Sequence, residues 1–461
     1  MNNFKKYGIT ALILLLLGGA YLLFSRGEAK EQTHQDAAGG QTPAGTGKSQ
    51  NAAPGEAPSH SLGKSEKTVT SITTNLPVFS ITTDPENLWS EDKGIYMLGK
   101  GASKKYPYKG ANYWKDWEIP VDLDYMENGK SVYKFSAGLK IFGGETRTLP
   151  QKSFALYAKN DNGNKTFDYS FFPEKQLSHY KTLVLRNGGQ DFNQTHFRDS
   201  LASTLVQGTN NDAQAYRPVV VYLNGDYWGI YDLREKIDKD FLAANHNGVK
   251  KKDMDLLESN ALIKEGSNKD YLDLVDFIKN HDLSNDKNYQ EVVQKIEVKN
   301  YIDYIVTELY IGNTDWPSHN YRYWKANAPF DKWRWIIYDS DLGFGDVNEN
   351  TVDRLYDYKG KGDDTLYISY LFRELLKNKQ FRNEFKQRSD ELLATTFAPD
   401  QVVGSIEAIR KQLEPEMPEH VKKWGGTVED WEQNVSQLKD FAQKRPEYLK
   451  QDLYKLFNTF H

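Results

Sequence analysis

The 461-residue chain contains no cysteine, and its net charge is only −5. The absence of cysteine excludes disulfides, thiolate zinc sites, cysteine nucleophiles and lipid anchoring through an N-terminal cysteine. The lack of an excess of basic residues argues against a protein that mainly binds nucleic acid. What the chain does have is 38% hydrophobic and 13% aromatic residues, enough to bury a large core and to exclude global disorder.

A long uncharged run lies at the N-terminus. Lys5 and Lys6 precede residues 7–25, which as a helix would rise about 28 Å, just enough to span the hydrocarbon of a bilayer. No A-x-A-like cleavage site precedes Arg26, so we predict a signal anchor, a transmembrane helix over residues 1–26. A cleaved signal peptide is the alternative. The rest of the chain is expected outside the cytoplasm, in a single-pass membrane protein or, after cleavage, in a secreted one.

Residues 27–70 have the composition of a disordered linker. Leu62 is the only large aliphatic residue between positions 31 and 68, and no aromatic residue occurs there. Such a segment cannot bury enough apolar surface to offset the entropy of ordering it. The folded domain is therefore expected over residues 71–461, with a β-rich lobe at about 71–245 and a mainly helical lobe at about 246–461.

The folded part has strand patterns first and mostly helical patterns afterwards, which predicts an α+β fold. Asn224 and Gly225 stand between two β-type runs and predict a hairpin over 217–233 with a type I′ turn. Asn193 is the expected N-cap of a helix that ends at Val206. The other expected strands are 119–125, 132–135, 138–142, 153–157, 181–185 and 332–338, and the other expected helices are 237–245, 271–279, 289–312, 366–393, 399–413, 428–445 and 447–457.

Acidic and amide side chains gather in two loops of the second half. Asp315 and Asn320 follow a long apolar helix, and Asp339 and Asp341 follow the strand at 332–338. If the carboxylates converge, each pair at about 6 Å costs roughly 3 kcal/mol unless a divalent cation lies among them. Protein kinases use the same D-x4-N spacing, in which the Asp receives the hydroxyl proton and the Asn binds metal. A structural calcium loop or an acidic turn is the alternative, although the spacing does not fit an EF-hand.

A nucleoside triphosphate also needs positive charge, and four basic residues are candidates. Arg147 and Lys152 lie in a β-rich stretch, while Arg186 and Arg198 flank a Gly-Gly pair and the start of a helix. Kinases pair a strand Lys with the phosphates and steady it with a Glu. Glu235, which ends the hairpin and opens a helix, is the candidate partner of Lys152. Solvated strand positions and surface ion pairs are the alternative interpretations of these charges.

Several separated segments together resemble the CotH kinase family, atypical kinases first associated with bacterial spore coats. The resemblance extends over roughly residues 80–457, and the stretch at 81–96 is similar to a lead-in of exported members. The segments that carry the resemblance are 147–154, 185–199, 221–238, 315–321, 335–341 and the region of Trp424 and Trp431.

This resemblance implies a highly diverged, bilobal protein-kinase-like fold that uses ATP with Mg²⁺ or Mn²⁺. The implied activity is phosphorylation of Ser or Thr in a protein substrate, with Lys152 and Glu235 expected to form an ion pair. With the basic candidates above, the expected site residues are catalytic Asp315, Lys152 and Glu235, metal-binding Asn320, Asp339 and Asp341, and phosphate-binding Lys152, Arg147, Arg186 and Arg198. Neither H-R-D nor D-F-G is present, so an ordinary protein kinase is not indicated.

Two other function classes remain open at this point. A non-catalytic surface module that retains the fold could bind glycan or protein through aromatic side chains, whose alternative role is core packing. A metal-dependent phosphohydrolase could use Asp339 and Asp341. The aromatic candidates for such a binding surface are Trp114, Trp117, Trp228 and Trp316.

Overall fold

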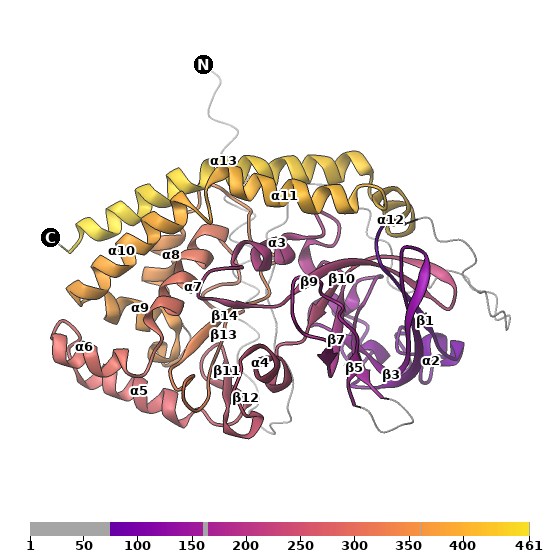
Figure 1. Ribbon diagram of the computed structural model, residues 1–461, viewed down its shortest axis with the longest axis horizontal. Helices are drawn as coiled ribbons and strands as arrows, with labels where there is room; N and C mark the ends of the chain where they lie inside the picture. Colours follow the sequence, from indigo (N-terminus) through magenta and orange to yellow (C-terminus); the bar gives the residue numbers. More distant parts are fainter. Residues whose placement is uncertain (1–73, 160–164, 361, 461) are drawn as a thin grey trace, which may run out of the picture. The chain divides into compact units, whose positions relative to one another are not determined.

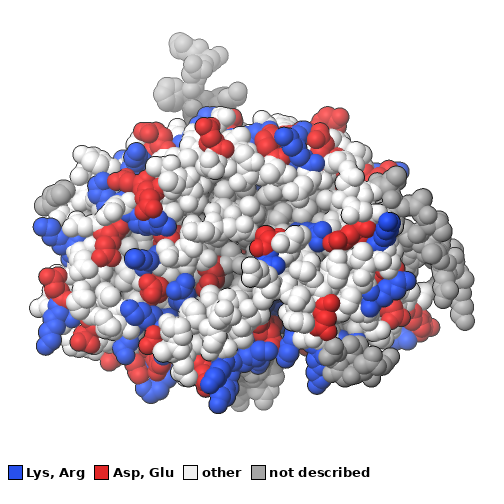
Figure 2. Space-filling view, viewed as in Figure 1, with Lys and Arg blue, Asp and Glu red and all other residues white. Residues whose placement is uncertain are grey.

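The computed structural model describes residues 74–159, 165–360 and 362–460 (Figure 1). The predicted anchor at 1–26 and the predicted linker at 27–70 lie outside these residues. Within the described part, no helix combines the length and the apolar character needed to cross a membrane. Figure 2 shows basic and acidic side chains interspersed over the face that it presents, without a large patch of one sign.

The β-rich part is a closed barrel of seven strands in the order β1-β2-β3-β4-β7-β10-β9. Its second strand alternates apolar and polar residues, so one face packs inward and the other meets solvent. A separate two-stranded sheet joins β5 (Phe167–Asp168) to β6 (His179–Tyr180). The barrel strands are β1 (Val78–Thr82), β2 (Ile119–Glu127), β3 (Lys130–Phe142), β4 (Ser153–Ala158), β7 (Thr182–Arg186), β9 (Tyr216–Leu223) and β10 (Asp226–Glu235).

The predicted hairpin is confirmed as β9 and β10, which pair antiparallel around Asn224 and Gly225. Both turn residues have positive φ, +51° and +82°, as a type I′ turn requires. Tyr231 and Leu233 on β10 are fully buried, and the strand ends at Glu235. The hairpin therefore places Glu235 where the barrel ends and the first of the following helices begins.

The second half is mainly helical and contains a five-stranded sheet in the order β12-β11-β13-β14-β8. Its strands are β8 (Asp212–Ala213), β11 (Asp255–Glu258), β12 (Leu262–Glu265), β13 (Arg322–Lys325) and β14 (Arg334–Ile337). The helices are α2 (Pro85–Trp89), which lies between the barrel strands β1 and β2, and α3 (Arg198–Leu205), α4 (Lys239–Asn245), α5 (Lys269–Asn280), α6 (Asp286–Val293), α7 (Val298–Ile311), α8 (Thr351–Asp357), α9 (Ile368–Leu376), α10 (Lys379–Ala394), α11 (Pro399–Leu413), α12 (Met417–Trp424) and α13 (Val428–Asn458). The predicted α+β class, with strands first and helices afterwards, is confirmed.

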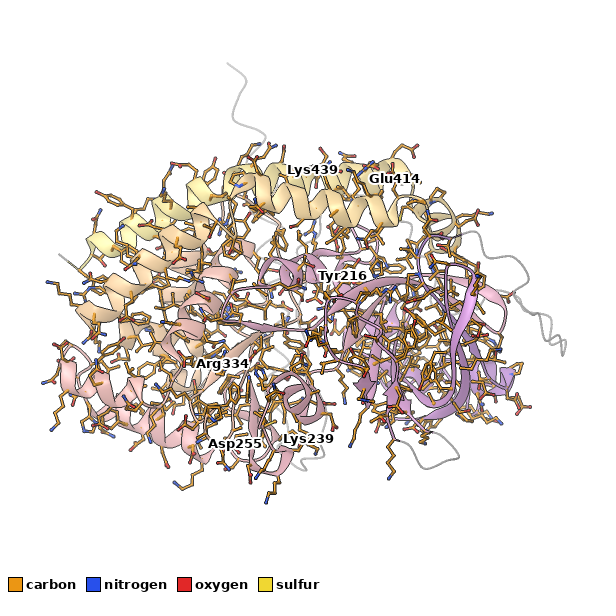
Figure 3. The ribbon with its side chains drawn as sticks, in the orientation of Figure 1. Tyr216, Lys239, Asp255, Arg334, Glu414 and Lys439 are labelled. Carbon is orange, nitrogen blue, oxygen red and sulfur yellow. The ribbon has the colours of Figure 1, made fainter. Side chains whose placement is uncertain are left out.

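Helix α7 and strand β14 are the elements that carry the acidic loops. Almost every residue of α7 is buried, and the helix ends at Gly312, whose φ of +64° turns the chain into the loop of Asp315. Strand β14 runs antiparallel to β13 and leads directly to Asp339. Figure 3 labels Arg334 at the start of β14 and Tyr216 at the start of β9. The rigid packing of both elements fixes the positions of the two loops.

Three of the expected helices differ from those observed. The helix expected from Asn193 begins only at Arg198, because the Asp191 carboxylate accepts the backbone N–H groups of Thr195 and Arg198 and organises a turn there. The helix expected at 289–312 is divided into α6 and α7, since Lys295 and Glu297 form backbone hydrogen bonds with Trp333. The helix expected at 366–393 is divided into α9 and α10, because the Asn378 side chain caps α10.

The two helices expected near the C-terminus are one continuous helix, α13, with Pro446 inside it. Proline removes one backbone hydrogen bond and normally ends or bends a helix. Here apolar side chains on both sides of Pro446 are buried, among them Phe441 and Leu449, so packing holds both halves in line. Figure 1 shows α11 and α13 lying along each other. Strands β1 and β11–β13 and helices α8 and α12 had no counterpart among the expected elements.

Candidate functional site

The predicted metal-binding carboxylates meet at a single guanidinium group. Arg186 is the last residue of β7, and its Nη2 lies 2.5 Å from Oδ1 of Asp339 and 2.6 Å from Oδ2 of Asp341. The two acids follow β14 and come from a part of the chain more than 150 residues away. The structure thus joins the end of a barrel strand to the acidic loop through a charge-assisted contact.

Asp199, on α3, extends this contact into the helical part. Its Oδ2 lies 3.9 Å from Nε of Arg186 and 2.5 Å from Nη1 of Arg234, and its Oδ1 accepts the backbone N–H of Ser340 at 2.8 Å. Burial by itself would raise the pKa of Asp199, but Arg234 and Arg186 outweigh burial and lower the pKa to about 2. Asp199 is therefore held as a carboxylate, and it fixes both Arg186 and the loop between Asp339 and Asp341. We call Arg186, Asp199, Asp339 and Asp341 the Arg186 cluster.

Asp315 and Asn320 lie beside this cluster. The Asn320 Nδ2 lies 3.4 Å from Oδ2 of Asp315 and 3.3 Å from the backbone oxygen of Asp339, and Asn313 donates to the same backbone oxygen at 3.1 Å. Both Asn320 and Asp339 have left-handed backbone conformations, with φ of +60° and +56°. Burial, and then the nearby charge of Asp339, raise the pKa of Asp315. The structure therefore brings Asp315, Asn320 and Asp339 together, as the spacing of the two loops predicted.

The oxygen atoms of this site suit a divalent cation. Asn320 uses its amide nitrogen in both contacts, and no described group donates to its Oδ1, so that oxygen remains for a ligand. Among the described residues, no three His, Asp or Glu side chains gather closely enough to hold a metal by themselves. Mg²⁺ usually binds one or two carboxylates together with phosphate oxygens and water, rather than a cage of protein groups. The donor set of Asp339, Asn320 and Asp341 fits that mode of binding.

Gly189, the second glycine of an adjacent pair, lets the backbone approach the acidic loop. Gly188 and Gly189 both have positive φ, +80° and +65°. A Cβ atom at Gly189 would lie 1.9 Å from Oδ2 of Asp341 and 2.7 Å from Nη2 of Arg186, and the next residue, Gln190, donates its N–H to Asp341 at 2.8 Å. Burial and the charge of Asp339 raise the pKa of Asp341, while Arg186 and the N–H of Gln190 oppose them. Gly189 is thus a direct part of the site.

The expected ion pair between Lys152 and Glu235 is absent. Lys152 lies just before β4, and its Nζ donates to the backbone oxygens of Arg147 at 2.6 Å and Leu149 at 3.0 Å. No carboxylate of the described residues lies beside it, and burial lowers its pKa to about 7. The ring of Tyr113 lies 4.2 Å from Nζ. Lys152 therefore stabilises the 143–152 loop by these hydrogen bonds.

Glu235 has other partners, because it ends β10 three residues before the N-cap of α4 instead of lying on a helix. It pairs with Lys175 and accepts the backbone N–H of Ala215 at 3.0 Å and the side-chain amide of Asn245 at 3.0 Å. These contacts connect the end of the barrel hairpin to α4. Any role of Lys152 or Glu235 in binding nucleotide stays a prediction.

The remaining two basic candidates, Arg147 and Arg198, make other contacts. Arg147 donates through Nε to the backbone oxygen of Gly143 at 2.5 Å, and so it also braces the 143–152 loop. Arg198 pairs with Asp191 at 3.1 Å and donates to the backbone oxygen of Gly343 at 2.9 Å. Of the four basic residues expected to bind phosphate, Arg186 is the one in contact with the predicted metal ligands.

The sequence-based reasoning missed Asp199 and Gly189. Asp199 lies directly after Arg198 in a segment that resembled the family, but nothing in its neighbours along the chain shows that it faces Arg186. The signal available for Gly189 was the Gly-Gly pair itself, since adjacent glycines commonly mark a close backbone approach. Both residues became visible only when β7, α3 and the acidic loop were placed together.

Comparisons with known proteins identify the family of this chain. A family model described as CotH kinase protein matches residues 139–449, well over half of the chain. The chain belongs to the CotH kinase family. The crystal structure of the Helicobacter pylori proinflammatory kinase CtkA is similar over 70% of this chain and 95% of that chain, with 11% identity and a TM-score of 0.25, and so weak a likeness carries no argument here. No curated protein sequence matches the chain. All members of the Arg186 cluster, together with Asp315 and Asn320, fall inside the matched range.

Proposed function

We propose that this CotH-family protein is an atypical protein kinase that transfers the γ-phosphate of ATP to a Ser or Thr hydroxyl of a surface or coat-type protein. The observation that carries the proposal is the meeting of Arg186 with Asp339 and Asp341 beside Asp315 and Asn320. Phosphoryl transfer needs little covalent chemistry from the protein, and positioning and charge neutralisation supply most of the rate. The site contains groups suited to both tasks.

Asp315 is the residue proposed to orient the acceptor hydroxyl. Its carboxylate receives the hydroxyl proton as the oxygen forms a bond to the γ-phosphorus and the bond to the β-phosphate oxygen breaks. The contacts of Asn320 hold Asp315 and the backbone of Asp339 in a fixed relation. Mg²⁺ or Mn²⁺, held by Asp339 and Asn320 with Asp341 alongside, would supply charge neutralisation for the β- and γ-phosphates.

Arg186 and Asp199 are proposed to take the part that a strand Lys and a helix Glu take in other kinases. In those enzymes a basic residue on a sheet strand is paired with an acid on the next helix, near the metal-binding Asp. Here β7 ends at Arg186, the next α-helix along the chain is α3, and its Asp199 faces Arg186. This pairing is independent of Lys152 and Glu235, whose side chains are committed to other groups.

The test uses purified full-length protein, γ-labelled ATP, Mg²⁺ or Mn²⁺ and casein as acceptor. We expect Asp315→Asn to lower transfer by about 10²- to 10⁴-fold while nucleotide binding is retained, because a positioned base contributes that much. Asp339→Asn should lose metal-dependent nucleotide binding. Asp346→Asn, at an exposed acid in the same loop, is the matched control and should behave as the wild type. Full transfer by both site variants would contradict the assignment.

The same assay separates the two alternatives. A phosphohydrolase would release labelled phosphate to water and leave the acceptor unlabelled, while a binding module would do neither. The aromatic surface that the binding module needs is reduced, since Trp228 and Trp316 are buried and Trp117, 37% exposed, is the clearest candidate that remains. Trp117→Ala should therefore leave transfer unchanged.

We further propose that the N-terminal segment anchors the protein in the cell membrane with the kinase domain outside the cytoplasm. The support is the uncharged run at 7–25 and the linker-like composition of 27–70. Protease added to intact cells should then remove the kinase domain and leave a short membrane-bound fragment. A domain protected from protease in intact cells, and digested only after lysis, would contradict this topology.

A further inference from the structure

Five side chains beneath the two acidic loops bury polar atoms that have no hydrogen-bond partner in the described residues. They come from four segments: α7, the Asp315 loop, the Asp339–Asp341 loop and α8. The atoms without a partner at full hydrogen-bond geometry are the Tyr304 hydroxyl, both carboxyl oxygens of Glu308, the indole N–H of Trp316, the Ser340 hydroxyl, and Nη2 of Arg354, whose Nε forms an ion pair with Oε1 of Glu349 at 3.3 Å. We call these five residues the Glu308 cluster.

Tyr304, Glu308, Trp316 and Arg354 each interact with a neighbour in the cluster, and Arg354 also interacts with Asp315. Burial raises the pKa of Glu308 to about 8. The Tyr304 hydroxyl and the charge of Arg354 act to lower this pKa, and the charge of Asp199 acts to raise it. Burial likewise lowers the pKa of Arg354, while Glu349, Glu308 and Asp315 act in the other direction. The rings of Tyr304 and Trp316 are 6.5 Å apart. Arg354 thus interacts electrostatically with both the buried Glu308 and the proposed catalytic Asp315.

Burying these polar atoms without water to bond them would cost too much free energy of folding. Each buried polar group without a partner costs about 1–3 kcal/mol, and native proteins leave few of them unsatisfied. Glu308 is fully buried, and neither of its oxygens has a donor at full hydrogen-bond geometry, although the Tyr304 hydroxyl lies close enough to lower its pKa. Donors on Trp316 and Arg354 and acceptors on Glu308 are both present, which is the mixture that internal water satisfies with two to four bonds per molecule.

We propose that the Glu308 cluster holds internal water, and that Glu308 and Arg354 act through this water as positioning residues for Asp315. Trp316 directly follows Asp315, and Ser340 stands between Asp339 and Asp341, so one water network reaches both loops. The positioning role rests on the proposed kinase function, whereas the water does not. The network would fix the geometry of Asp315 relative to the acceptor hydroxyl, where a displacement of about 1 Å can cost up to 10²-fold in rate.

Two pairs of variants test the positioning role with labelled ATP and casein. Glu308→Leu should lower kcat about tenfold, while Glu308→Gln, which keeps the shape and hydrogen bonds of a neutral carboxyl group, should stay within about twofold of the wild type. Tyr304→Phe should lower kcat, whereas Tyr310→Phe should not. Tyr310 is a matched control, because it is also on α7, fully buried and without a partner for its hydroxyl, but packs on Phe397 and Phe441 outside the cluster.

In the supporting result, the KM for ATP and the melting temperature of Tyr304→Phe match those of Tyr310→Phe, so that only kcat separates the two. Wild-type kcat in both Glu308→Leu and Tyr304→Phe would overturn the positioning role, and so would equal losses in Tyr304→Phe and Tyr310→Phe. A wild type without transfer would overturn the proposed function and the positioning role with it. A high-resolution crystal structure tests independently whether internal water is bound in the cluster. Ordered water bonded to Glu308 and Arg354 would support the proposal, and the absence of ordered water there would overturn it.

Discussion

Two buried basic residues, Arg186 and Lys152, show opposite ways of holding a positive charge. Arg186 has carboxylates of Asp339, Asp341 and Asp199 around it, and these raise its pKa well above the usual value although burial alone would lower it. Lys152 has backbone oxygens as acceptors and no carboxylate among the described residues, so burial lowers its pKa to about 7. Counter-charges, more than burial, decide which of the two remains a permanent cation.

The two residues also differ in the parts of the chain that surround them. The carboxylates around Arg186 all lie within the range that matches the family, residues 139–449. Lys152 packs against Tyr96 and Tyr113, which precede that range. The Arg186 cluster is therefore built from the shared domain, whereas the setting of Lys152 depends partly on residues that come before it.

The largest expected effect comes from removing the charge of Arg186. Arg186→Met should lower the free energy of unfolding by about 3–5 kcal/mol, because it leaves three neighbouring carboxylates without their shared cation. Transfer activity should be lost with it. Urea unfolding and the casein assay measure the two effects separately.

Arg186→Lys is the matched variant for this experiment. It restores a charge but not the planar group that contacts two carboxylates at once, so stability should recover in part and activity less. If Arg186→Met unfolded like the wild type, the three acids would not depend on Arg186, and the contrast with Lys152 would fail.

The convergence of Asp315, Asn320 and Asp339 could be predicted because each follows a strongly patterned element. The apolar run of α7 and the strand at 334–337 are local signals, and loops at the ends of such elements are where reactive side chains are presented. The contacts of Arg186 with Asp199, Asp339 and Asp341 could not be predicted, because they depend on how β7 packs against α3 and the acidic loop. Spacing along the chain contains no information on those contacts.

The incorrect pairing of Lys152 with Glu235 has a related cause. The prediction placed Glu235 at the end of the hairpin, where it would open a helix and pair with Lys152, whereas Glu235 is already satisfied by Lys175 and Asn245. The helix boundaries failed for the same kind of reason: the break before α7 is made by backbone contacts to Trp333, far along the chain. Tertiary contacts override local propensity at these points.

A smaller effect distinguishes Lys152 by its pH dependence. Its pKa is about 7 in the folded chain and 10.5 as the ordinary value, so between these values the unfolded chain binds a proton that the folded chain lacks. Stability should therefore rise with pH in this window, and be lowest below pH 7. The free energy of unfolding of the wild type should gain about 2 kcal/mol relative to Lys152→Met between pH 7 and pH 9.

Urea unfolding of both proteins at the two pH values measures this difference, and other titrating groups cancel because they are common to both. A constant difference between the wild type and Lys152→Met would mean that Lys152 keeps its proton, and would remove the contrast with Arg186.

The smallest expected effect probes how closely the backbone approaches the Arg186 cluster. Gly189→Ala places a Cβ atom 1.9 Å from Asp341, whereas Gly208→Ala, also at positive φ, meets nothing within 4 Å. Both variants incur the backbone strain of alanine at positive φ, about 1 kcal/mol, so their difference isolates the contacts with Asp341 and Arg186. We expect Gly189→Ala to be less stable than Gly208→Ala by about 1–2 kcal/mol in urea unfolding, and less active in transfer. Equal stability and equal activity would show that Asp341 and Arg186 move away from the added Cβ atom at little cost, and that the close approach of Gly189 does not constrain the Arg186 cluster.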